Sequence, residues 1–93
     1  MIESFACHET AALWQGKRSR RIPADIQGRA LQKLILLHSA TRLENLRIPP
    51  SNRLELLKGD RAGHHSIRIN GQRRICFAWT GQNAANVEIV DYH

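Results

Sequence analysis

The chain has 93 residues, enough for one hydrophobic core and too few for two, so we expect a single domain over residues 1–93. An apolar fraction of 42% is typical of a folded protein and excludes a disordered tail. Fourteen Lys and Arg residues against eight Asp and Glu give a formal charge of +6, which favours an anionic partner such as nucleic acid or an acidic protein.

No targeting or membrane segment stands out in the sequence. No apolar run approaches the roughly 20 residues of a spanning helix, and the opening MIESFACHET lacks the order of a signal peptide. We therefore expect a soluble cytoplasmic protein without a membrane partner. Cys7 and Cys76 are far apart in apolar contexts, which favours buried thiols over a disulfide or a metal pair.

The first half of the chain is predicted to be mainly helical. After a short edge strand in MIESFA, the segment HETAALWQGKRSRR contains a short helix that ends near Gly16. Pro23 is suited to the first turn of a longer helix, and Asp25 follows it closely. The apolar stripe of this helix is predicted to contain Ile26, Ala30, Leu34 and His38, with Leu31 and Ile35 alongside.

The second half is predicted to be a sheet. RIPPSN closes the helical half, because the residue before each proline is pushed toward an extended conformation. RLELL, HSIRIN, RICFAW and VEIVDYH then read as strands, and the Asn-Gly pair in NGQ is a hairpin signal. The order of elements predicts an α+β fold in which two N-terminal helices pack on one face of a small antiparallel sheet. The other face would be open to solvent or to a substrate.

Charged and titratable side chains are predicted to gather on or near that open face. Arg68 and Arg74 alternate with Ile67 and Ile75, so both arginines should point away from the helices. A regular last strand would direct Tyr92 and His93 to opposite sides, so a twist would be needed to bring both to one site. The full candidate cluster is Lys58, Arg61, Arg68, Arg74, Asp91, Tyr92 and His93.

The sequence contains no metal-ligand spacing, no glycine-rich phosphate loop and no serine nucleophile elbow. RNA cleavage by its own 2′-hydroxyl needs none of these. The protein supplies only a base, an acid for the leaving 5′-oxygen, and cations for the charge that builds on phosphorus. We therefore expect no metal and no cofactor. Each candidate also has a plain structural explanation, such as a solubilising role in a turn for Lys58 and Arg61.

The segments RLELLKGDRAGHHSIRINGQRRICFAW and VEIVDYH resemble the HigB-type host-inhibition toxins, or plasmid maintenance system killer proteins, of the RelE/ParE superfamily. The likeness extends over essentially the whole chain. It implies a RelE-like toxin of a type II toxin-antitoxin system, a ribosome-dependent endoribonuclease that cuts messenger RNA in the A site. It also implies a helix-turn-helix antitoxin of HigA type, and through that antitoxin an indirect link to operator DNA.

The resemblance also implies roles for individual residues. By position, Lys58, Asp91, Tyr92 and His93 match residues implicated in cleavage, with His93 as the leading acid-base candidate. Arg74 matches a phosphate-binding arginine. We expect it to hold the scissile phosphate with help from Arg68 and Lys58, and Arg61 is a further substrate-binding candidate. Two positions depart from the family pattern: Glu55 stands where some relatives have histidine, and Arg73 stands where many have tryptophan. The resemblance therefore implies no acid-base role for Glu55, and Arg73 would either loosen packing or find a carboxylate.

Two other functions remain open on the sequence alone. The same superfamily contains members that act on DNA gyrase, and in such a noncatalytic poison the arginines and the tail would only bind. A plain RNA-binding module is the third alternative, although few aromatic residues are present for base stacking. The Tyr92-His93 pair favours catalysis, because binding alone would not require it.

Overall fold

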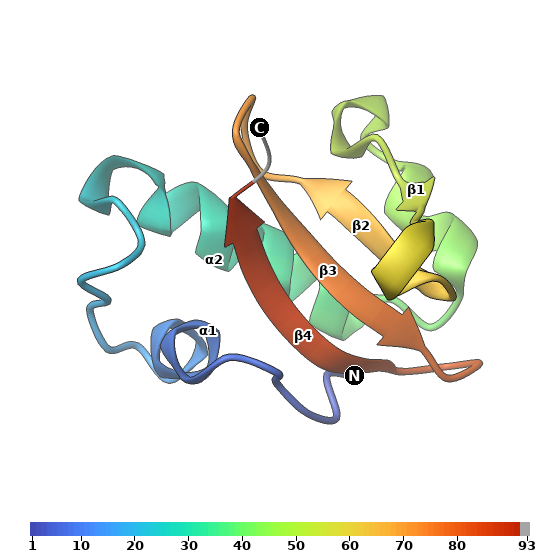
Figure 1. Cartoon of the computed structure of the whole chain (residues 1–93), viewed down its shortest axis with the longest axis horizontal. Helices are drawn as coiled ribbons and strands as arrows, with labels where there is room; N and C mark the ends of the chain where they lie inside the picture. The colour runs from blue at the N-terminus through green and yellow to red at the C-terminus, as the bar shows by residue number, and fades with distance from the viewer. Residues whose placement is uncertain (92–93) are drawn as a thin grey trace.

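The computed structural model describes residues 1–91, which form two helices and a four-stranded antiparallel sheet (Figure 1). The predicted α+β, RelE-like arrangement is confirmed. The sheet order is β1-β2-β3-β4. The elements are α1 (His8–Trp14), α2 (Ala24–Ser39), β1 (Glu55–Leu56), β2 (His64–Arg68), β3 (Arg73–Trp79) and β4 (Ala84–Asp91), with 3-10 turns η1 (Leu43–Arg47), η2 (Pro50–Asn52) and η3 (Gly59–Arg61).

Helix α2 lies behind the sheet and supplies much of the core, whereas α1 lies beside β4 (Figure 1). Ile26, Ala30 and Leu34 are buried as predicted. The prediction that Ile35 flanks the stripe is wrong, because its side chain is 51% exposed. At 3.6 residues per turn Ile35 lies about 180° around the helix from Ile26, whereas Leu37 lies only about 20° from it and is buried instead.

The long hairpin of β2 and β3 alternates as the sequence predicts. Ile67 and Ile75 are register partners with no exposed surface, and they belong to the core that α2 covers. Arg68 and Arg74 are the next pair in the register, on the opposite face. In the turn between the strands, the Asn70 side-chain oxygen accepts hydrogen bonds from the backbone amides of Gln72 and Arg73. This turn fixes the register that places the two arginines opposite each other.

The last strand begins earlier than predicted. β4 starts at Ala84, inside the predicted loop TGQNAAN, and Asn86 adopts a left-handed φ of 52°. The opening MIESFA forms two isolated parallel bridges to this strand, at Ile2 and Phe5, rather than a regular strand. Across residues 1–91, no helix is long and apolar enough to cross a membrane.

Candidate active site

Arg74 is firmly held on the face of the sheet opposite α2, where Ser66 and Cys76 are buried as well, although the sequence predicts that this face is open. The Arg74 side chain is only 8% exposed. Nε donates to Ser66 Oγ at 2.7 Å, and Nη2 donates to the backbone oxygens of Arg53 and Ser66. Nη1 lies 3.8 Å from Glu55 Oε1, which is too long for a hydrogen bond but close enough for an ion pair. The guanidinium is therefore fixed in orientation before any substrate binds.

Arg68 lies directly opposite Arg74 in the register of β2 and β3. Its Nε donates to the backbone oxygen of Asn70 at 3.1 Å, so the turn orients this side chain. Like charges that face each other across antiparallel strands repel, and an anion between them would relieve that repulsion. Both arginines line a hollow of about 240 Å³, which we call the arginine hollow. Its other lining residues are Arg53, Glu55, Asn70 and Gly71.

Two other predicted site residues lie outside the arginine hollow. The Arg61 guanidinium forms an ion pair with Glu88 at 2.5 Å, and Arg61 belongs to the short turn η3. Lys58 is exposed and directly precedes the same turn. The structure thus brings Arg68 and Arg74 together and places Lys58 and Arg61 around η3.

Asp91 lies on the face of the sheet opposite to that of Arg74. It is the register partner of Arg73, and its carboxylate is 3.6 Å from Arg73 Nη2. This pair lines a cavity of about 280 Å³ together with Glu9 and Arg21, next to α1. Of the two outcomes considered for Arg73, the structure shows the ion pair with a carboxylate. Asp91 does not share the arginine hollow, and Tyr92 and His93 lie outside the described residues.

Cys76 is buried on the face opposite α2, and its register partners are Ser66 and Glu88. Burial raises the pKa of its thiol, outweighing the opposing effects of Arg61 and Arg74. A thiol that stays protonated near neutral pH is a poor nucleophile. We therefore expect Cys76→Ala to leave the RNA cleavage rate within about threefold of wild type, because cleavage by the 2′-hydroxyl of the RNA does not need a thiolate. A single-turnover cleavage assay would check this, and a loss of 100-fold or more in a folded variant would contradict it.

Three residues that build the arginine hollow were missed in the sequence. Ser66 and Arg53 hold Arg74 through a hydroxyl and a backbone carbonyl, and Arg53 reaches that position with a left-handed φ of 46°. Nothing local in the sequence indicates these long-range contacts. Asn70 was recognised only as a turn residue. Within residues 1–91, no three His, Cys, Asp or Glu side chains group in a way that could hold a metal ion.

Comparison with known proteins identifies the family of this chain. Residues 4–93 match the family described as RelE-like toxin of type II toxin-antitoxin system HigB. Toxin HigB-1 of Vibrio cholerae is 44% identical over 70 residues, which cover 75% of this chain and 74% of the relative. Endoribonuclease HigB of Proteus vulgaris is 30% identical over 93 residues, the full length of both chains. The chain therefore belongs to the HigB-like toxin family of type II toxin-antitoxin systems.

Proposed function

We propose that this toxin is an endoribonuclease that cuts messenger RNA in the ribosomal A site and so inhibits translation. The observation that carries the proposal is the fixed Arg74 guanidinium, which faces Arg68 across a hollow open to solvent. The Proteus vulgaris relative, named an endoribonuclease, matches over its full length. A pre-oriented cation beside a solvent-open hollow suits a reaction in which charge builds on phosphoryl oxygens.

In this proposal the substrate supplies its own nucleophile. The 2′-hydroxyl attacks the adjacent phosphorus, the bond from phosphorus to the 5′-oxygen breaks, and the products are a 2′,3′-cyclic phosphate and a 5′-hydroxyl. Arg74 and Arg68 stabilise the negative charge on the phosphoryl oxygens. His93 donates the proton that the 5′-oxygen takes up, and Tyr92 or Lys58 serves as the base that accepts the proton of the 2′-hydroxyl. Asp91, paired with Arg73, acts as a positioning residue for the end of β4.

A type II toxin-antitoxin family implies an antitoxin partner. We propose that this partner is a helix-turn-helix protein of HigA type, that it connects the toxin indirectly to operator DNA, and that the toxin acts in the cytoplasm on ribosomes. The formal charge of +6 suits both an acidic antitoxin and the phosphate backbone of RNA. Poisoning of DNA gyrase is not favoured, because the full-length match is to a protein named an endoribonuclease.

The test is to add the purified toxin to ribosomes programmed with a defined message and to map the message ends. We expect cuts inside the A-site codon and no comparable cleavage of the same message without ribosomes. Prior addition of the antitoxin should abolish the cuts. An intact message, together with inhibition of gyrase supercoiling in a parallel assay, would contradict the proposal.

A further inference from the structure

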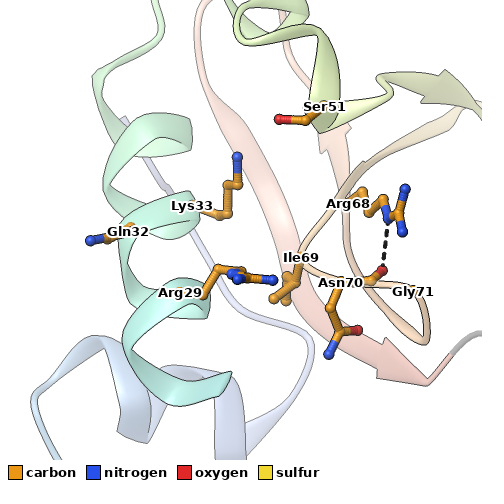
Figure 2. A pocket seen from close by; sticks show the side chains of 8 residues that line it. All are labelled: Arg29, Gln32, Lys33, Ser51, Arg68, Ile69, Asn70 and Gly71. Atoms are coloured by element: carbon orange, nitrogen blue, oxygen red, sulfur yellow. Dashed lines mark hydrogen bonds between the residues drawn. The ribbon is translucent and has the colours of Figure 1, made fainter. Parts of the chain in front are cut away.

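A second basic hollow lies between α2 and the turn that joins β2 to β3. It has a volume of about 330 Å³, within the range of small-ligand sites (~300–1,000 Å³). Figure 2 shows Arg29 and Lys33 extending from α2 on one side and Arg68 and Asn70 on the other. We call it the α2 hollow. Among the described residues that line it, none is acidic.

Arg29 and Lys33 lie close together on α2, and within residues 1–91 no carboxylate lines the α2 hollow to balance their charge. Arg29 and Lys33 are four residues apart on the helix, a spacing at which like charges destabilise each other. The Lys33 ammonium donates to Asn52 Oδ1, and the buried Asn52 amide in turn donates to the Leu46 and Ile48 carbonyls. Burial lowers the pKa of Lys33, and the neighbouring Arg29 charge lowers it further. A bound anion would favour the charged ammonium and so act against both effects.

The α2 hollow adjoins the arginine hollow. Arg68, Asn70 and Gly71 line both, so the two form one continuous basic surface that passes around the β2–β3 turn. A nucleic acid strand carries anions at regular intervals along one chain and can occupy two adjoining basic hollows at once. A single carboxylate from a protein partner would fill only one. Continuity with the proposed cleavage site therefore favours RNA as the ligand.

We propose that the α2 hollow binds a second phosphate of the RNA strand whose scissile phosphate lies in the arginine hollow, with Arg68 between the two. This inference rests on the proposed function. It adds a second place where the toxin holds its RNA substrate, next to the scissile phosphate. Arg29 and Lys33 are then substrate-binding residues. Ser51 and Asn70, which also line the hollow, offer hydrogen-bonding groups to the sugar and phosphate oxygens.

The test compares the double variant Arg29→Gln/Lys33→Gln with wild type in binding 2′-O-methyl RNA, which cannot be cleaved by its own 2′-hydroxyl. A dinucleotide with one phosphate and a hexanucleotide with five are measured by fluorescence anisotropy across a salt series. We expect the hexanucleotide to bind about tenfold more weakly, with a salt slope shallower by about 0.7 for each phosphate that the variant no longer neutralises. Dinucleotide binding should change less than twofold.

The matched control is Lys17→Gln/Arg47→Gln, which removes the same charge from two exposed positions outside both hollows. An equal loss in both double variants, or unchanged hexanucleotide binding, overturns the inference. Unchanged RNA binding with weakened antitoxin binding would assign the hollow to the antitoxin and also overturn it. The single variant Arg29→Gln leaves the hydrogen bond from Lys33 to Asn52 in place. A weaker hexanucleotide affinity in this variant therefore cannot come from loss of that structural contact. Because the assay needs no cleavage, its outcome is independent of whether the toxin cuts RNA on ribosomes.

Discussion

Arg74→Gln is expected to lower the rate of message cleavage by about 10²- to 10³-fold, the usual cost of removing one pre-oriented donor from a developing oxyanion. Arg74 Nε and Nη2 are committed to Ser66 and Arg53, so the fixed guanidinium is part of the fold before RNA arrives. Arg74→Lys should recover only part of the rate. An ammonium keeps the charge but cannot make the same set of directed hydrogen bonds.

The loss of cleavage must be separated from a loss of stability. Arg74 is buried, and its removal leaves the Ser66 hydroxyl and the Arg53 carbonyl without a donor, at a cost of about 1–3 kcal/mol for an unsatisfied buried group. Cleavage should therefore be measured in single turnovers on protein whose fold is checked by circular dichroism and antitoxin binding. Arg47→Gln, an exposed arginine in η1, is the control and should cleave at the wild-type rate. A folded Arg74→Gln variant with normal cleavage would remove Arg74 from the site.

Leu34→Ala is expected to reduce the free energy of unfolding by about 2–5 kcal/mol, the range for a leucine deleted from a packed core. Leu34 has no exposed surface and belongs to the core between α2 and the sheet. Ile35→Ala, one residue further along the same helix, should change stability by no more than about 0.5 kcal/mol, because Ile35 is half exposed. The free energies of unfolding of both variants would be measured by urea denaturation. Equal losses would show that the face of α2 that packs on the sheet is misassigned.

The fold was largely predictable because its signals are local. Alternation in HSIRIN and RICFAW placed Ile67 and Ile75 on one face and the arginines on the other, and the register confirms this. The predicted apolar stripe of α2 is confirmed at Leu34 and wrong at Ile35. A residue every four positions drifts around a helix of 3.6 residues per turn, so Ile35 falls outside the buried face. The start of β4 was missed because the segment at Ala84 carries no alternation and owes its strand to pairing with β3 and the N-terminal segment.

The candidate site was only partly predictable, because its geometry depends on contacts between distant segments. Arg68 and Arg74 were found by strand parity, and the structure shows them facing each other. Asp91 was predicted to join the same cluster, but it pairs with Arg73 on the opposite face from Arg74. The Arg53 carbonyl that holds Arg74 comes from 21 residues earlier in the chain, and no local pattern encodes it.

The central claim is that the RNA supplies the nucleophile while the toxin supplies fixed charge and proton transfer. The most direct measurement places a single 2′-deoxy nucleotide on the 5′ side of the scissile phosphate in a message programmed on ribosomes. The account predicts that cleavage at that bond disappears, and that the unmodified message yields a 2′,3′-cyclic phosphate and a 5′-hydroxyl. Cleavage of the deoxy message at the same bond and rate, or products that carry a 5′-phosphate, would contradict it.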